Sequence, residues 1–203
     1  MILNLITAPA TEPFVLAEME DHVRLPGQLT EERALGESLI TTVRQLAETV
    51  TKRALITQTW ELTLDEFPAG RDAISLPLPP LQKVNSITYI DAAGVTQTYA
   101  ANLYRTVQDS HTAYLFPIYG ERWPSTLNDV AVIKINFTCG YGPISPLTEY
   151  NIPGPILQWM KLNFANYFEN RETVVIEASR AVLLDTTATL ADGLISNYRL
   201  LKL

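Results

Sequence analysis

The apolar residues between positions 29 and 60 follow two periods, one after the other. The first recurs in steps of three or four, which places its members on one stripe of an α-helix; they are Leu35, Leu39, Val43, Leu46 and Val50. Thr30 is a candidate N-cap, acids follow it at positions 31 and 32, and Lys52 and Arg53 lie at the other end, as the helix dipole favours. The pattern predicts a helix of roughly 24 residues, about 36 Å long. One small β-domain does not need so long a covering helix, so we expect something else to pack along it.

The second period begins directly after this helix. Residues 56–64 are β-branched or aromatic and alternate in polarity, which predicts a β-strand. Trp60, Leu62 and Leu64 share one face of this strand, and we expect Trp60 to be largely buried where the helix meets the sheet.

Before the long helix, the pattern predicts two shorter segments. Residues 1–14 contain two prolines, so we expect an extended arm rather than a core element. Residues 16–25 predict a short helix with Leu16, Met19 and Val23 turned inward, ended by Pro26-Gly27. Two helices joined so closely form an αα-hairpin.

After residue 56 the pattern is that of β-structure up to residue 142. Seven strands are predicted, at 57–65, 73–78, 84–91, 95–100, 103–108, 112–117 and 130–138. Residues 91–94 form a hairpin turn in which Gly94 can adopt positive φ. The three prolines in 76–81 remove backbone donors, so this segment fits a sheet edge or an extended crossing but not a central strand. The strand at 130–138 is the most apolar.

The chain then returns to helix at 156–172. The apolar stripe of this helix is Leu157, Met160, Phe164, Tyr167 and Arg171, and Trp159, Leu162 and Phe168 lie beside it. Because it is apolar around most of its circumference, we expect more than one partner to cover it. The predicted fold class is α+β, a helical core with an inserted antiparallel β domain. The predicted domains are 1–55 (arm and helical hairpin), 56–142 (β domain), 143–172 (return helix) and 173–203 (C-terminal arm).

Composition and charge exclude several classes of function. Hydrophobic residues make up 47% and charged residues 18% of the 203 residues, as in globular proteins. The net charge of −7 argues against a protein that grips nucleic acid by its phosphates, although it allows one that lets DNA pass. The absence of a basic segment before the first apolar residues argues against a signal peptide, and no run reaches the length of a membrane span. We therefore expect a soluble protein of the cytoplasm or of a soluble assembly.

The residues that could carry chemistry have ordinary structural explanations. His22 and His111 have no acid or nucleophile at a recognisable spacing, and the single Cys139 ends an apolar strand without a cationic neighbour. The glycines at 140 and 142 lack the lysine of a phosphate-binding loop and fit a turn after a strand. The acids Asp65, Glu66, Asp72 and Asp91 fall at strand ends and turns. We predict no metal site, no cofactor and no enzymatic activity. The alternative is a small enzyme or ligand-binding domain with a pocket in the β region.

The signals for assembly are stronger. The helices carry more apolar surface than a small domain needs, and the chain ends in an apolar and basic segment at 194–203. This tail can dock on its own subunit, or on a neighbour or partner, and the pattern leaves both open.

The sequence resembles a known protein family in several short motifs. The stretch 48–60, ETVTKRALITQTW, is similar to a hallmark of the adaptor, or head–tail connector, proteins of tailed double-stranded-DNA phages and gene transfer agents. Further motifs follow in the family's order: LPLPPL at 76–81, VxSITYID at 84–91 with Gly94, Trp123-Pro124, FTCGYG at 137–142, YFENRE at 167–172 and LxxxYR at 194–199. Departures are Val15, where the family more often has Ser or Thr to cap the short helix, and residues 173–193, which match poorly.

The resemblance implies a helical connector core with an inserted β domain and a place in the neck of a virion or phage-like particle, assembled in the bacterial cytoplasm. It implies a ring, typically of twelve subunits, beneath the portal protein, which extends the DNA channel and offers a surface to stopper and tail-completion proteins. Genomic DNA would pass without specific binding, and no membrane would take part. The residues that it implies for portal binding are Leu194, Tyr198, Arg199, Leu200 and Leu201.

Overall fold

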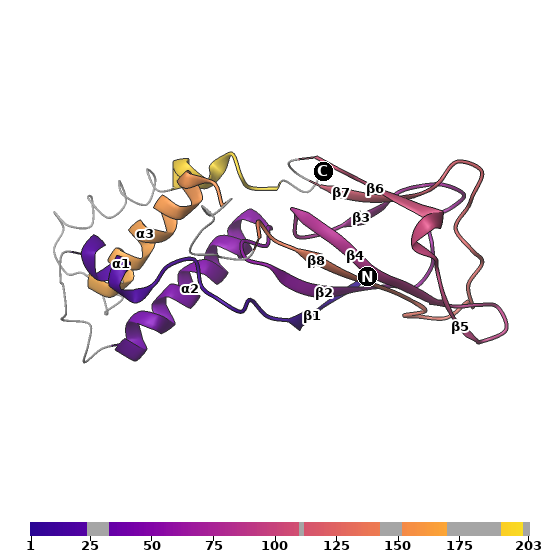
Figure 1. Cartoon of the computed structure of the whole chain (residues 1–203), viewed down its shortest axis with the longest axis horizontal. Coiled ribbons are helices and arrows are strands. Elements are labelled where there is room, and N and C mark those ends of the chain that lie inside the picture. Colours follow the sequence, from indigo (N-terminus) through magenta and orange to yellow (C-terminus); the bar gives the residue numbers. More distant parts are fainter. Residues whose placement is uncertain (24–32, 110–111, 143–151, 170–191, 201–203) are drawn as a thin grey trace, which may run out of the picture. The chain divides into compact units, whose positions relative to one another are not determined.

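The computed structural model describes residues 1–23, 33–109, 112–142, 152–169 and 192–200 (Figure 1). The chain divides into two compact units. Unit 1 consists of Met1–Ala10 and Arg53–Pro143, and unit 2 consists of Thr11–Lys52 and Ile144–Leu203. Helices and antiparallel sheets are both present, which confirms the predicted α+β class.

Unit 1 contains a five-stranded antiparallel sheet with β8 in its centre. Its strand order is β1 (Ile2–Thr7), β2 (Gln58–Leu64), β8 (Ile133–Cys139), β4 (Leu81–Ile90) and β5 (Thr96–Thr98). Ile133, Ile135 and Phe137 of β8 are fully buried. The most apolar strand predicted from the sequence is thus the central one, because a strand with neighbours on both sides and a covered face loses most of its contact with water.

A second sheet of three strands completes unit 1. Its order is β3 (Ile74–Leu76), β7 (Ala113–Pro117) and β6 (Tyr104–Gln108), and the short 3₁₀ helix η2 (Ala101–Leu103) precedes β6. β3 lies at an edge and ends at Leu76, and the prolines that follow belong to no strand but connect β3 of this sheet to β4 of the other, so the prediction that they do not lie in a central strand is confirmed. Prolines in a connection between strands remove no hydrogen bond from either sheet.

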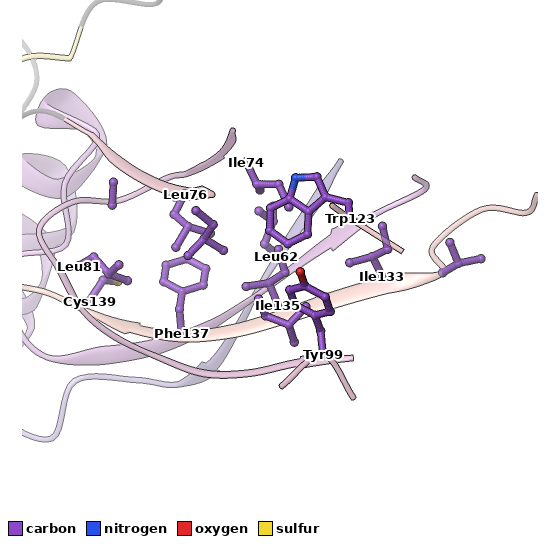
Figure 2. Packing of buried hydrophobic residues seen from close by; sticks show 14 of the residues in the cluster. Leu62, Ile74, Leu76, Leu81, Tyr99, Trp123, Ile133, Ile135, Phe137 and Cys139 are labelled. Carbon is purple, nitrogen blue, oxygen red and sulfur yellow. The ribbon is translucent and has the colours of Figure 1, made fainter. Parts of the chain in front are cut away.

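The core of unit 1 lies between these two sheets. Buried side chains of β2, β4 and β8 face those of β3 and β7 in one cluster, and Figure 2 shows Leu62 and Ile135 opposite Ile74 and Leu76. Trp123 belongs to the same cluster and donates its indole N–H to the backbone oxygen of Asp72 at 2.8 Å. The β region is therefore a packed two-layer sandwich.

Two expectations for unit 1 were wrong. The segment predicted as an N-terminal arm contains β1, which pairs with β2 from Ile2↔Thr63 to Thr7↔Thr59 and so belongs to the sheet. Trp60 is only partly buried, although it packs against the core cluster, and its indole N–H donates to Gln58 Oε1 at 3.2 Å. Its strand is second from the edge of the sheet, where fewer side chains are available to cover a large ring.

The described part of unit 2 includes α1 (Leu16–His22), α2 (Arg33–Thr51) and α3 (Gly154–Glu169), each of which contacts the other two. Helix α1 is shorter than predicted, and Val15 occupies its N-cap position without a side-chain hydrogen bond. Met19 is the buried residue of this helix. Thr30, the acids at 31 and 32, Pro26-Gly27 and Arg171 lie outside the described residues.

The buried face of α2 overlaps the predicted apolar stripe only in part. Leu35 is exposed, while Leu39, Leu46 and Val50 are only partly buried. Of the predicted stripe only Val43 is fully buried; the other buried residues, Gly36, Ile40, Arg44, Ala47 and Thr51, lie one position further along the chain than the predicted ones. Leu16 of α1 fills the space beside Gly36, where a Cβ atom would come within 2.5 Å of its Cδ1. The buried face of α2 is thus determined by the close packing of α1 and by an ion-paired arginine. The periodicity of large apolar residues detects neither of these features.

Helix α3 buries Ile156, Trp159, Met160 and Phe164, and exposes Leu162 and Tyr167. Its predicted stripe is therefore right at Met160 and Phe164 and wrong at Tyr167. Ile156 and Trp159 lie on the same side of the helix as Met160, since residues three and four apart are neighbours on an α-helix.

Candidate partner interface

The segment 192–200 of unit 2 contains most of the residues implied for partner binding. It begins with a short helical turn at 192–196 and lies beside α3 and the C-terminal end of α2 (yellow in Figure 1). Local hydrogen bonds hold the turn: Ser196 Oγ donates to the Gly193 oxygen at 2.9 Å, and the Tyr198 amide donates to the Ile195 oxygen at 3.0 Å.

This segment is anchored on its own unit. Ile195 is completely buried, and the Leu200 amide donates to the backbone oxygen of Thr51, at the end of α2, at 3.2 Å. A buried isoleucine of this kind contributes about 1.5–3 kcal/mol by transfer from water alone. Of the two possibilities that the sequence left open, docking on the same subunit therefore holds for residues 192–200.

The residues implied for portal binding share this segment but differ in exposure. Leu194, Tyr198 and Leu200 are partly buried, and Arg199 is exposed and ion-paired with Asp192 at 3.2 Å. Leu201 lies outside the described residues. Sequence reasoning missed Ile195 as the anchor, although its apolar side chain in a helical turn beside Leu194 was the available signal.

Exposed apolar side chains also occur on the helices of unit 2 and at the N-cap of α1. They are Val15, Leu35, Leu162 and Tyr167. Scattered exposed apolar residues are normal on a protein surface, but Leu and Tyr on helices that already have a filled core are what a further packing partner would cover.

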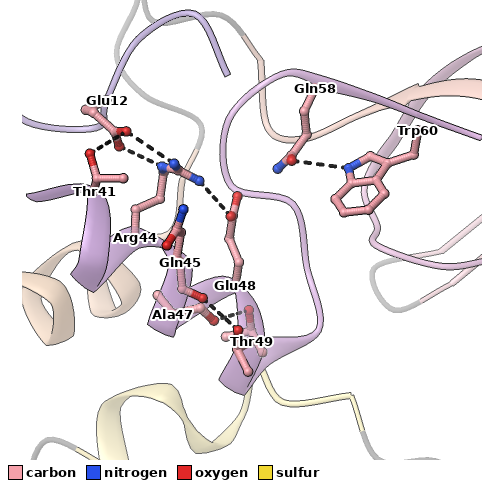
Figure 3. A network of polar contacts seen from close by, with 10 residues as sticks. Glu12, Thr41, Arg44, Gln45, Ala47, Glu48, Thr49, Gln58 and Trp60 are labelled. Atoms are coloured by element: carbon pink, nitrogen blue, oxygen red, sulfur yellow. Dashed lines mark hydrogen bonds and ion pairs between the residues drawn. The ribbon is translucent and has the colours of Figure 1, made fainter. Parts of the chain in front are cut away.

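The buried face of α2 contains one charged centre. Arg44, with only 5% of its surface exposed, donates to both carboxylate oxygens of Glu12, at 2.6 and 3.2 Å, and to Glu48 at 2.8 Å (Figure 3). Burial alone would lower the pKa of the Arg44 guanidinium, but the hydrogen bonds and the charges of Glu12 and Glu48 outweigh it and raise this pKa. Thr41 adds a hydroxyl hydrogen bond to Glu12 at 3.0 Å. The network ties the segment before α1 to α2 and is structural.

Two of the acids considered as candidate catalytic groups, Asp91 and Asp65, accept backbone amides instead. Asp91 Oδ1 accepts the Ala93 and Val95 amides at 2.9 and 3.0 Å, and Oδ2 accepts the side chain of Gln97 at 2.8 Å. The hydrogen bond from Gln97, followed by that from Val95, lowers the pKa of the Asp91 carboxyl. Asp65 accepts the Ala131 amide at 2.8 Å. This agrees with the interpretation of these acids as turn formers.

The remaining candidates also have structural positions. His22 is in the last turn of α1, the Cys139 thiol is buried with its sulfur 3.8 Å from the Gln58 oxygen, and His111 lies outside the described residues. Among the residues that the structure describes, no group of three or more His, Cys, Asp or Glu side chains could hold a metal ion. Nor is any described helix long and apolar enough to cross a membrane.

Comparison with known proteins adds the decisive observation. No protein-family model matches the sequence, and no curated protein is significantly similar to it. The chain is similar to several solved structures. One is the neck of an empty gene transfer agent (GTA) particle computed with C6 symmetry, with 25% sequence identity and a TM-score of 0.75. Another is the virion of a native GTA particle, with 27% sequence identity and a TM-score of 0.75. A third is the neck of a native GTA particle computed with C12 symmetry, at 26% and 0.72. Each similarity covers 100% of this chain and 97% of the other.

The chain is similar to proteins of GTA particle necks along its whole length. The predicted resemblance to connector proteins of phages and GTAs, and the predicted location in the neck of a phage-like particle, are thereby confirmed. Because the similarity extends over both chains almost completely, it includes the helical unit and the β-sandwich together. The similarity supports a structural role in the neck of such a particle.

Proposed function

We propose that the protein is a head–tail adaptor that forms a ring beneath the portal of a phage-like particle. The ring, of twelve subunits, extends the DNA channel and presents a docking surface to stopper and tail-completion proteins. The observation that carries this proposal is the whole-length similarity to chains of GTA necks computed with C6 and C12 symmetry.

Three features of the chain support this assignment. The exposed apolar residues on and beside the helices of unit 2 provide surface for packing between subunits. The segment 192–200 presents a tyrosine and an arginine, the residue types that most often anchor interfaces. The net charge of −7 suits a channel through which DNA slides, since an acidic wall repels phosphates. Nothing among the described residues favours the alternative of an enzyme or ligand-binding domain.

Portal binding is the step to test first. Removing residues 190–203 would also remove the buried Ile195, so loss of binding by such a truncation would not separate folding from docking. The double variant Tyr198→Ala, Arg199→Ala avoids this because neither side chain is fully buried. We expect it to melt within a few degrees of the unmodified protein and to lose co-sedimentation with the cognate portal.

The matched control is Asn197→Ala, an exposed residue in the same segment, which should co-sediment normally. Electron microscopy of the unmodified mixture should show twelvefold rings stacked on the portal. Normal co-sedimentation of the double variant would contradict these residues as the portal anchor, and the absence of any ring on the portal would contradict the adaptor function.

A further inference from the structure

The outer edge of strand β1 has no partner among the described residues. Within the part of the chain that the structure describes, β1 is hydrogen-bonded only to β2, and its other side presents backbone N–H and C=O groups. The pairing is regular from Ile2 to Leu5 and shifts between Leu5 and Thr7. A regular stretch of four residues is therefore available for another strand.

The composition of β1 does not protect this edge. Ile2, Leu5 and Ile6 keep 56%, 46% and 54% of their surface exposed, and no charged residue or proline occurs from Ile2 to Thr7. Soluble proteins normally blunt an exposed edge with charges, prolines or a very short strand. An edge that is regular, apolar and uncharged is instead typical of a strand that pairs in an assembly.

The other edges of unit 1 are protected in these ways. The opposite edge of the same sheet is β5, with only three polar residues, Thr96–Thr98. In the three-stranded sheet, β3 is three residues long and is followed by prolines, and β6 carries Arg105. Among the described strands, β1 is thus the edge whose sequence favours addition of a further strand.

The rotational symmetry of the proposed ring provides an occupant for the edge of β1, namely the neighbouring subunit. In a ring with rotational symmetry each subunit contacts the next through two different surfaces, since the contact runs head to tail. A sheet edge that accepts an extended segment of the next subunit is one such surface, and it is available once in every copy. Strand addition also supplies directional backbone hydrogen bonds, which fix the register of each subunit against its neighbour.

We propose that β1 forms one half of the contact between neighbouring copies of this chain, with an extended segment of the next copy added to its free edge. The inference rests on the ring assembly proposed above and names the surface by which that ring closes. The added segment belongs to a different part of the neighbour than β1 itself, because pairing of two β1 edges would give a closed two-fold dimer and no ring.

Hydrogen–deuterium exchange tests whether the backbone of β1 becomes paired. We expect amides within residues 2–5 that exchange freely in the dissociated subunit to slow by about tenfold in the portal-bound ring, since each gains a hydrogen bond. Contact through side chains alone would leave their exchange unchanged and would overturn the proposal.

Photo-crosslinking identifies the occupant. Asn4, exposed on the side of β1 away from the core, is replaced by benzoylphenylalanine, and isotope-labelled and unlabelled chains are mixed before assembly on the portal. We expect cross-links between labelled and unlabelled copies, from position 4 to a segment other than β1. Cross-links only to portal, or only from β1 to β1, would overturn the proposal.

Charge on the edge should disrupt the contact without unfolding the sandwich. Ile2→Lys places a cation on the exposed side of β1, and Val95→Lys is the control, with 53% exposure in a turn of the same unit. We expect Ile2→Lys to reduce ring formation at least severalfold while Val95→Lys does not. Rings of normal yield from both variants would overturn the β1 contact and leave the adaptor function standing. If the unmodified chain forms no ring at all, both proposals fail together.

Discussion

Gly140 ends the central strand β8 at a place where no other residue fits. Its φ is +113°, and a Cβ atom there would collide with the backbone carbonyl of Ile56. Its amide donates to the Pro80 oxygen at 2.9 Å, and its oxygen accepts the side chain of Gln82 at 2.9 Å. The turn after β8 thus holds the beginnings of β2 and β4 against one another.

We therefore expect Gly140→Ala to lower the free energy of unfolding by about 2–4 kcal/mol, the combined cost of positive φ and overpacking. Gly94→Ala is the matched control, because φ is +80° there but no atom lies within 4 Å of the place that a Cβ atom would take. It should cost about 1 kcal/mol, from backbone strain alone. Denaturant titration measures both, and equal losses would contradict the close approach to Ile56.

Asp91 gives a pH-dependent contribution whose sign is fixed by its hydrogen bonds. Its folded pKa lies below the ordinary value of 3.8, so its stabilising effect is complete above that value and is lost as the pH falls through the folded pKa. We expect the melting temperature of Asp91→Asn to lie below that of the unmodified protein at about pH 5 and the difference to shrink towards about pH 3. Asp129→Asn, exposed in the same unit, is the control. A difference that does not change with pH would contradict the charge-dependent turn.

Turn residues such as Asp91 and Gly94 are predicted well from the sequence, but the exposure of individual side chains is predicted less well. Asp91 and Gly94 were identified correctly because turn chemistry is local and needs only neighbours in the chain. The burial of Trp60 was overestimated. How far this side chain is buried depends on which strands flank β2 and on which residues cover that face of the strand, and the alternation of polar and apolar residues at 56–64 contains neither piece of information.

At the scale of elements, α2 shows how a helix can bury a face that its leucines do not mark. A glycine that admits Leu16 and an arginine neutralised by Glu12 and Glu48 are both buried, while Leu35 is exposed. An analysis of hydrophobic periodicity predicts that glycine and arginine lie on the exposed face of a helix. The existence and approximate length of the helix were predictable, but the side that faces the core was predicted only in part, at Val43.

We expect Arg44→Met to lower the free energy of unfolding by about 3 kcal/mol, because it leaves Glu12 and Glu48 without their cation in a largely buried position. Arg33→Met on the same helix removes only the exposed pair with Glu37 and should cost less than about 0.5 kcal/mol. Thermal and denaturant unfolding of both variants measures the contrast. Similar small losses would mean that the Arg44 network does not stabilise unit 2.

At the scale of the whole molecule, the net charge determines whether the protein binds DNA through its phosphates. With a charge of −7, we expect no retention of duplex DNA in a gel-shift assay at physiological salt. Binding through phosphate contacts would instead be tight at low salt and weaken steeply as salt is raised. Such salt-sensitive retention would contradict a channel that lets DNA pass.

The order of strands along the chain was predictable, but their assembly into sheets was not. All seven strands predicted between residues 56 and 142 exist, each within a few residues of its expected bounds. The pairing of residues 2–7 with β2 was missed, since it joins segments more than 50 residues apart and local periodicity carries no record of it. For the same reason the apolar end of the chain was recognised, but not its attachment to α2 through Leu200.

The division of unit 2 between two distant parts of the sequence also sets the order in which the protein can fold during synthesis. Every strand of the sandwich has been translated by residue 143, whereas α2, made much earlier, lacks the partner helix α3 until residue 169. On the ribosome the part of α2 that packs against α3 must therefore wait for its partner while the whole sandwich is made. We expect the nascent chain to complete the β-sandwich of unit 1 first and the helical unit 2 last.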